Sequence, residues 1–199
     1  MGDRSGQPTL VDAARDYLRR KYNKPGNVFV GVVHRLDRPV SGVVLFARTS
    51  KGASRLSEQF RLRTVEKTYH ALVEGNVSPA SGILQDRLVK DRSRNVVTVA
   101  DEDDDDGQDC VLAYRRLKKV GRLTLVEIRP KTGRSHQIRV QLSSHGWPIV
   151  GDKKYGSRMH VDGFIGLHAA SLTFQHPTSK EPITVSAAAP NGWSRLETV

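Results

Sequence analysis

Five short β-rich runs in the middle of the chain constrain its fold more than any other feature of the sequence. Gly, Pro, Ser or charged residues separate the runs, which cover positions 68–73, 83–89, 96–100, 111–117 and 123–128. Short runs rich in Val, Ile, Thr and Tyr with separators of this kind are typical of strands. Their spacing predicts an antiparallel meander.

Helical patterns and further strands flank this central region. Apolar residues recur at helical spacing in positions 9–22, 50–63 and 134–144, and Thr9 is the expected N-cap of the first helix. Other apolar runs predict strands at 28–33, 43–47, 164–174 and 182–187. Because strands dominate and helices are inserted among them, we expect an α+β protein with a mostly antiparallel, mixed sheet and a few flanking helices.

The length of the chain, 199 residues, suffices for one domain with a sizeable core, so we expect a single domain over 1–199. The sequence contains no run of about 18 apolar residues, the length that a transmembrane helix needs. Its first residues lack the apolar core of a signal peptide. The single cysteine, Cys110, excludes an intramolecular disulfide framework and a multi-cysteine zinc site. These features predict a cytoplasmic protein.

The charge of the chain is strongly one-sided. Lys and Arg number 32 against 21 Asp and Glu, for a net charge of +11, and seven of the acidic residues lie together in positions 101–109. This surplus favours a polyanionic partner, nucleic acid first and an acidic membrane surface second, although charge for solubility alone would look the same. We interpret the acidic run 101–109 as an exposed loop, and mimicry of nucleic acid beside a binding site is the alternative.

The densest polar cluster is segment 34–42, His-Arg-Leu-Asp-Arg-Pro-Val-Ser-Gly, which apolar runs hold at both ends. Functional sites are often built from polar side chains on loops pinned in this way. The charges of Arg35 and Arg38 favour an ionised Asp37, which suits a nucleophile or an electrostatic stabiliser better than a general acid. Asp-x-Pro and Ser-Gly are also ordinary turn sequences, so a purely structural turn is the alternative.

A second polar cluster begins at Gly133. The predicted helix that follows carries Arg134, His136, Gln137 and Arg139 in its first turns. A helix N-terminus with arginine donors binds anions readily, and a solvated helix start is the alternative interpretation.

Tyr69 lies in the predicted strand 68–73. Its neighbour on the same face of that strand is the apolar Ala71, which favours a place in the core. Stacking on a nucleobase is the functional alternative.

At these three places the sequence resembles the RluA-type pseudouridine synthases. Segment 34–42 matches the signature loop of that family, 67–69 matches its Lys-x-Tyr motif, and 133–139 matches its Gly-Arg-x-His-Gln-Ile-Arg motif. Further matches follow at 146–152 (Gly-x-Pro-Ile-x-Gly-Asp), 167–169 and 174–177. The motifs stand in the family's order from about residue 8 to residue 193, and a collinear set is far more specific than any single motif.

The resemblance implies an isomerase that converts specific uridines of ribosomal or transfer RNA to pseudouridine. In this reaction the base is detached from the ribose, rotated and reattached through carbon. The resemblance also implies the α+β fold of these enzymes, RNA as the partner, and neither a metal nor another cofactor. The target base must be flipped out, because its bond to the sugar cannot be reached within a stacked helix.

The resemblance also assigns candidate site residues. Asp37 matches the catalytic aspartate, for which attack on the ribose, attack on the base and removal of a sugar proton are the alternatives. Tyr69 matches a tyrosine that stacks on the target uracil and helps to remove the proton from its carbon. Arg139 matches the basic residue paired with the aspartate, with Arg134 as the alternative. Arg35 matches an arginine that enters the RNA stack as the base leaves. The other candidates for RNA binding and base flipping are His34, Arg134, His136 and Gln137.

The sequence departs from the family's pattern in three places. Val40 stands where Thr is usual, and Gln141 stands where His is common. The strand that members of the family carry ahead of the position of Gly2 is expected to be missing from the sheet. A catalytically silent RNA-binding protein on the same scaffold is the alternative function, since the surplus of basic residues would serve it equally well.

Overall fold

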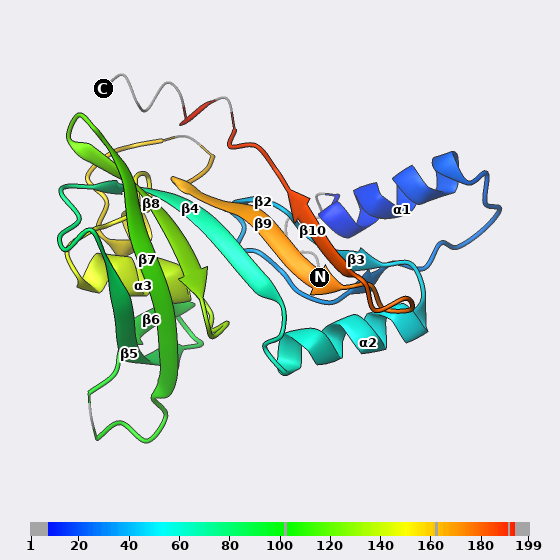
Figure 1. Cartoon of the computed structure of the whole chain (residues 1–199), viewed down its shortest axis with the longest axis horizontal. Helices are drawn as coiled ribbons and strands as arrows, with labels where there is room; N and C mark the ends of the chain where they lie inside the picture. The colour runs from blue at the N-terminus through cyan, green and yellow to red at the C-terminus, as the bar shows by residue number, and fades with distance from the viewer. Residues whose placement is uncertain (1–7, 102, 162, 191, 194–199) are drawn as a thin grey trace. The chain divides into compact units, whose positions relative to one another are not determined.

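The computed structural model describes residues 8–101, 103–161, 163–190 and 192–193 (Figure 1). Contacts between Cα atoms divide the chain into two compact units. Over its described residues, the first unit is drawn from Met1–Arg35, Val44–Thr64 and Gln175–Pro182, and the second from Leu36–Val43, Val65–Phe174 and Ile183–Val199. Each unit therefore combines segments that are far apart in the sequence.

The first unit begins with helix α1 (Leu10–Lys21), as the sequence predicts. Thr9 is its N-cap and forms a capping box with Asp12, whose backbone N–H donates to the Thr9 hydroxyl at 3.2 Å while its carboxylate accepts the Thr9 backbone N–H at 2.9 Å. This reciprocal pair satisfies two backbone donors that a helix start otherwise leaves unpaired.

The remaining regular elements described in the first unit are strands β1 (Gly31–Val32) and β3 (Phe46–Ala47) and helix α2 (Ser50–Arg61). The strands predicted at 28–33 and 43–47 are too long, since only two residues of each pair with each other. Val28 and Val30 are buried all the same, which explains the apolar run without a strand partner. Helix α2 ends before the predicted position 63, where Arg63 has a φ of +59°.

An eight-stranded sheet forms the centre of the second unit. Its path runs β10–β9–β4–β8–β7–β5–β6, and β2 (Ser41–Gly42) pairs with β9 in parallel. The strands of the path are β4 (Glu66–Glu74), β5 (Ser81–Asp91), β6 (Val96–Val99), β7 (Gln108–Val120), β8 (Leu123–Pro130), β9 (Leu167–Gln175) and β10 (Pro182–Ser186). This mixed, mostly antiparallel sheet with inserted helices confirms the predicted α+β class.

The predicted simple meander is wrong, because β4 and β5 are not neighbours. Strand β4 lies between β8 and β9, and β7 lies between β8 and β5. Ala71 and Val73 on one face of β4 and Leu72 on the other are all buried, in two different apolar clusters. A strand that is buried on both faces needs a central place in the sheet.

The acidic run 101–109 is predicted to be a loop over its whole length, but its end belongs to a strand. Its last two residues, Gln108 and Asp109, already belong to β7, where they pair with Leu88 and Arg87 of β5. The loop between β6 and β7 therefore closes before Gln108.

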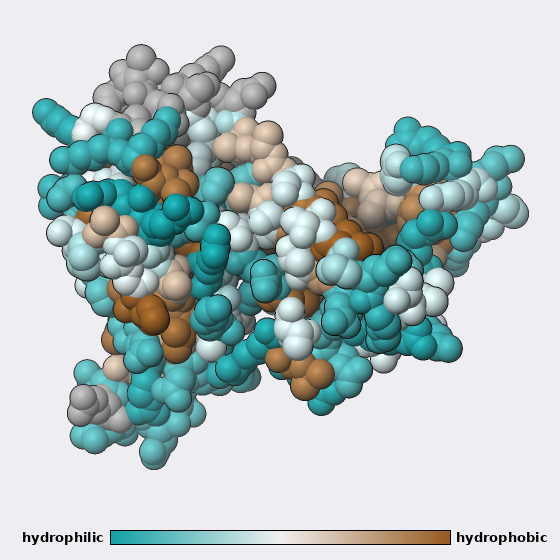
Figure 2. All heavy atoms as spheres, in the orientation of Figure 1, coloured by the Kyte–Doolittle hydropathy of each residue, from teal (hydrophilic) through white to brown (hydrophobic). Residues whose placement is uncertain are grey.

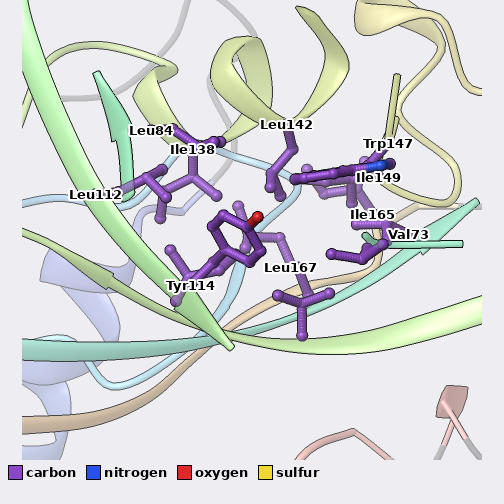
Figure 3. Packing of buried hydrophobic residues seen from close by; sticks show 14 residues of the cluster. Val73, Leu84, Leu112, Tyr114, Ile138, Leu142, Trp147, Ile149, Ile165 and Leu167 are labelled. Atoms are coloured by element: carbon purple, nitrogen blue, oxygen red, sulfur yellow. The ribbon is translucent and has the colours of Figure 1, made fainter. Parts of the chain in front are cut away.

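Helix α3 (Gln137–Ser144) covers one face of this sheet. Figure 3 shows Ile138 and Leu142 pointing from the helix toward Tyr114 of β7. The helix starts three residues later than predicted, because His136 has a left-handed φ of +51°. The surface visible over β5, β7 and β8 is mostly hydrophilic, with small hydrophobic groups in between (Figure 2). None of the described helices is long and apolar enough to cross a membrane.

Candidate active site

Asp37 opens a tight turn in the second unit. The backbone N–H of Val40 donates to the Asp37 carbonyl at 3.0 Å, and Ile165 N–H donates to the Pro39 carbonyl at 3.1 Å. The Val40 side chain packs against the main core cluster, where a threonine hydroxyl would face apolar neighbours. Asp37 is therefore the turn residue that its sequence suggests, and its side chain, 26% exposed, remains available for chemistry.

The other end of this loop is anchored to β9. Ser41 Oγ lies 2.8 Å from Nδ1 of the buried His168, whose Nε2 lies 3.1 Å from the carbonyl oxygen of Ala187. Gly42 has a φ of +119°, and a Cβ at this position would lie 2.3 Å from the Ala169 carbonyl oxygen. Only glycine fits so close to the backbone of a neighbouring strand. The loop that carries Asp37 is thus fixed on both sides.

Arg139, on α3, joins Asp37 to a second carboxylate. Its Nη1 donates to Asp37 Oδ2 at 3.0 Å, while its Nε and Nη2 donate to the two oxygens of Asp152 at 2.7 and 2.8 Å. Arg139 and Asp152 are only 6% and 2% exposed. Burial by itself would lower the pKa of Arg139, but the hydrogen bonds and charges of Asp152 and Asp37 raise it above its ordinary value. A permanent cation is therefore held against the Asp37 carboxylate.

Of the two arginines predicted as partners of Asp37, Arg139 forms the ion pair and Arg134 does not. Arg139 makes the contact, whereas Arg134 lies before the helix and donates from Nε to the Asp109 carbonyl at 3.3 Å. Helix α3 begins at Gln137, so Arg134 and His136 lie before its first turn. The predicted anion site, with Arg134 and His136 as donors in the first helical turns, is therefore not formed.

Tyr69, on β4, packs against the main core cluster. Burial raises the pKa of its phenol to about 12, and the nearby negative charge of Asp37 adds to this shift. The phenol is therefore neutral at physiological pH. The partly buried ring agrees with the predicted place in the core, and the charge of Asp37 acts on its hydroxyl; stacking on a nucleobase stays a prediction.

His136 also faces Asp37. Its Nε2 lies 3.9 Å from Asp37 Oδ2, and its Nδ1 lies 2.5 Å from the hydroxyl oxygen of Tyr155. Burial lowers the pKa of His136, as do the charges of Arg139 and of two lysines, whereas Asp37 opposes the shift. The imidazole is therefore neutral at physiological pH.

Gln137, a candidate for RNA contact, is instead buried. Its amide oxygen accepts from the Thr132 hydroxyl at 2.8 Å and from Arg134 N–H at 3.1 Å, and its amide nitrogen donates to Gln141 at 3.0 Å. Gln141, fully buried, donates in turn to Asp86 Oδ2 at 2.7 Å. This chain of amides ties the 131–136 loop to the sheet.

His34 and Arg35 both belong to the first unit. The His34 ring stacks on Phe60 with 4.7 Å between ring centroids, and its Nε2 accepts the Leu45 backbone N–H at 2.8 Å. These contacts fix the His34 side chain within the first unit. Arg35 is exposed, and in the described part of the chain its side chain makes no hydrogen bond or ion pair.

Basic side chains surround the 131–136 loop. Lys67 Nζ donates to the Thr132 carbonyl at 3.3 Å, and Lys90 Nζ donates to the Ser135 hydroxyl at 3.3 Å. Lys154, whose charge acts on His136, donates to the Asn95 carbonyl at 3.1 Å. Together with Arg134 these three lysines form what we call the basic rim, which suits a polyanionic ligand.

Two residues of the site, Asp152 and Tyr155, were not among the candidates from the sequence. The Gly-Asp end of segment 146–152 was the available signal for Asp152, whereas no pattern in the sequence pointed to Tyr155. Among the described residues, no group of three or more His, Cys, Asp or Glu side chains is placed to hold a metal ion.

The fold resembles that of pseudouridine synthases of known structure. A human protein named RNA Pseudouridylate Synthase Domain Containing 4 superimposes with a TM-score of 0.80 at 23% identity, over 95% of this chain and 82% of that chain. A second, RNA Pseudouridylate Synthase Domain Containing 1, has a TM-score of 0.72 at 25% identity, over 89% of this chain and 74% of that chain. The predicted fold is thereby confirmed.

Sequence comparison then identifies the family. Residues 3–144 match the family model described as RNA pseudouridylate synthase. The chain is 36% identical to tRNA pseudouridine synthase C of Vibrio cholerae over 82% of its own length and 74% of that protein. It is 38% identical to ribosomal large subunit pseudouridine synthase D of Xanthomonas campestris over 96% of its own length and 61% of that protein. The chain belongs to the RNA pseudouridylate synthase family, which confirms the predicted class of RNA isomerase.

Proposed function

We propose that this chain isomerises specific uridines of ribosomal or transfer RNA to pseudouridine, with Asp37 as the catalytic carboxylate, and that it acts in the cytoplasm. In the reaction the bond between uracil N1 and ribose C1′ breaks, and a bond between C5 and C1′ forms. The proton on C5 is lost and N1 gains one, so substrate and product are isomers. Because nothing is oxidised or reduced, the chemistry needs no redox cofactor, and side chains suffice.

The contact between Asp37 and Arg139 is the observation that carries this proposal. The carboxylate is partly exposed on a rigid turn, while the cation beside it is buried and held by Asp152. An ionised, aimed carboxylate is what attack on the sugar or the base, or removal of a sugar proton, requires. A purely structural ion pair would not need one partner to remain open to solvent.

Tyr69 supplies the second part of the proposed site. A neutral phenol of high pKa on an apolar wall offers a flat surface on which a uracil ring can stack. The hydroxyl of Tyr69 would assist removal of the C5 proton. We assign both roles to Tyr69.

RNA binding falls in this proposal to Arg35 and the basic rim. Arg35 is exposed two positions before Asp37, so it can enter the RNA stack as the target base leaves. The lysines of the rim and Arg134 would contact phosphates of the RNA. His136 would act beside the Asp37 carboxylate, which its Nε2 faces. For His34 and Gln137 we propose support of the loops that carry these residues.

Tritium release from RNA labelled at uracil C5 tests the proposal, since the tritium is lost to water when C5 bonds to the sugar. The assay uses mixed ribosomal and transfer RNA from cells that lack the gene. We expect release with the wild-type protein and a loss of at least about a thousandfold with Asp37→Asn. Asp16→Asn, at an exposed carboxylate of α1, should retain full activity as the matched control.

The same experiment addresses the silent RNA-binding alternative. RNA binding without tritium release from any of these RNAs would favour that alternative over catalysis. Salt dependence of binding would not separate the two, since both rest on phosphate contacts. Full activity of Asp37→Asn would contradict the role given to the carboxylate.

A further inference from the structure

A short turn in the second unit contacts both groups that face the Asp37 carboxylate. It consists of Asp152 and the single 3-10 turn Lys153–Tyr155 that follows it, and we call it the 152–155 turn. Asp152 and Tyr155 are buried, whereas the two lysines between them are exposed. The buried ends of the turn point their polar atoms at Arg139 and His136.

Asp152 fixes the guanidinium of Arg139. Two parallel hydrogen bonds of 2.7 and 2.8 Å form a fork that leaves Nη1 directed at Asp37. The Tyr155 ring supports the same guanidinium, whose carbon lies 4.9 Å from the ring centroid. A guanidinium held on its edge and its face has little freedom to rotate away from Asp37.

The Tyr155 hydroxyl makes two contacts, and their donors can be assigned. Val97 N–H must donate to the hydroxyl oxygen at 3.1 Å, because a backbone N–H cannot accept. The phenolic proton is then left for Nδ1 of His136. If Nδ1 carried a proton instead, the phenolic proton would have no acceptor in a buried place, which is costly.

The tautomer of His136 follows from this assignment. A neutral imidazole carries one proton, so an accepting Nδ1 puts that proton on Nε2. Nε2 lies 3.9 Å from Asp37 Oδ2, the same oxygen that accepts from Arg139. Arg139 Nη1 and His136 Nε2 therefore both face Oδ2 of the carboxylate, and among the described residues no hydrogen bond is recorded to the other oxygen, Oδ1.

We propose that Tyr155 and Asp152 are positioning residues: Tyr155 fixes the Nε2–H tautomer of His136, Asp152 fixes Arg139, and together they orient the Asp37 carboxylate so that Oδ1 faces the substrate. The tautomer and the orientation of Arg139 stand independently of the reaction. The role in catalysis rests on the proposed function.

Nitrogen NMR of the histidine side chains tests the tautomer directly. Two-bond ¹H–¹⁵N spectra of the labelled protein at neutral pH distinguish Nε2–H from Nδ1–H rings, and the signals that disappear in His136→Asn identify His136. We expect the Nε2–H pattern in the wild-type protein and a mixture of both tautomers in Tyr155→Phe. Tyr114→Phe, which removes the hydroxyl of another buried tyrosine, should leave the His136 pattern unchanged. An Nδ1–H pattern in the wild-type protein, or no change in Tyr155→Phe, would overturn the assignment.

Single-turnover tritium release tests the positioning role. We expect Tyr155→Phe and Asp152→Asn to lower the maximal rate by about 10-fold to 100-fold with RNA affinity within about twofold of wild type. Asp152→Glu should recover part of the rate lost in Asp152→Asn. Glu58→Gln serves as the control, because Glu58 is an exposed carboxylate of α2 that forms an ion pair with Arg61.

The pH profile gives a readout that a structural role would not move. The charged groups that act on His136 are Asp37, Arg139, Lys154 and Lys90, and all four remain in Tyr155→Phe. In Tyr155→Phe the tautomer of His136 is no longer fixed while those charges are unaltered, so the acidic limb of the pH–rate profile should shift. Unchanged rates and an unchanged profile in both variants would overturn the positioning role. Full activity of Asp37→Asn would instead overturn the proposed function and leave the NMR result standing.

Discussion

Arg139 Nη1 donates to Asp37 Oδ2 at 3.0 Å, although the two residues are 102 positions apart in the sequence. The remaining donors of the same guanidinium hold Asp152. One buried cation thus serves two carboxylates, one buried and one partly exposed. A point charge could not form this fork, because the geometry needs a planar group with three directed N–H donors.

Arg139→Lys should therefore impair both stability and activity. The ammonium retains the charge but cannot form the fork to Asp152 and reach Asp37 together, so we expect a loss of about 2 kcal/mol in the free energy of unfolding. Turnover should fall about a hundredfold. Urea unfolding and tritium release measure the two effects. Arg115→Lys, at an exposed ion pair with Glu127, should change neither by more than about 0.5 kcal/mol or twofold, and equal effects in both variants would contradict the argument.

Tyr69→Phe separates stacking from proton transfer. The ring is retained, so RNA affinity should stay within about twofold, whereas loss of the hydroxyl should slow turnover about 10-fold to 100-fold. Because the pKa of the Tyr69 phenol is raised to about 12, the rate of the wild-type protein should show no titration of Tyr69 below that pH. Wild-type turnover by Tyr69→Phe would leave Tyr69 with a stacking role alone.

Gly42→Ala should destabilise the protein more than most single substitutions. The added Cβ would lie 2.3 Å from the Ala169 carbonyl oxygen at a φ of +119°, so β2 could not stay paired with β9. We expect a loss of more than about 3 kcal/mol by urea unfolding. Gly75→Ala is the control, since φ is also positive but nothing lies within 4 Å of the new Cβ, and it should cost only about 1 kcal/mol. Equal losses would show that steric overlap at Gly42 is relieved.

His136 should make the stability of the protein fall with acidification. Burial is the main cause of its lowered pKa, so the folded state binds a proton less readily than the unfolded chain, whose histidine has the ordinary value of 6.5. The stability linked to this group is complete well above that value and is lost as the pH falls through it. His136→Asn should therefore lose less stability than the wild-type protein between about pH 7.5 and about pH 5. His70, whose pKa is also lowered by burial, contributes in the same direction to both proteins. A larger loss in the variant would contradict this expectation.

The acidic loop should be dispensable for catalysis. Arg87 holds the backbone carbonyls of Asp104 and Gly107 at 3.0 and 3.1 Å, so the loop keeps these contacts when its carboxylates are removed. Replacing Asp103, Asp104, Asp105 and Asp106 by Ser should leave tritium release within about threefold of wild type. A large rise in non-specific RNA affinity would instead support mimicry of nucleic acid by the loop.

Local signals in the sequence predicted much of the secondary structure. Thr9, the expected N-cap, marks the start of α1, and alternating or continuous apolar runs mark β4, β5, β7 and β8, with strand ends differing by a few residues. The order of the strands depends on contacts between distant segments, such as the pairing of β4 with β9, and periodicity carries no information on those contacts. The start of α3 and the end of α2 depend on the positive φ of His136 and of Arg63, which periodicity does not predict either.

The sequence by itself determined the family, the residues that can do chemistry and the turn on which Asp37 stands, because these depend on motifs and local turn preferences. Only the tertiary structure decided that Arg139 and not Arg134 reaches Asp37, that Gln137 is buried, and that Tyr155 and Asp152 complete the site. Each of these outcomes follows from the packing of α3 and the 152–155 turn against the sheet. Residue type limits which hydrogen bonds a side chain can make, but folding decides which partner comes within 3 Å of it.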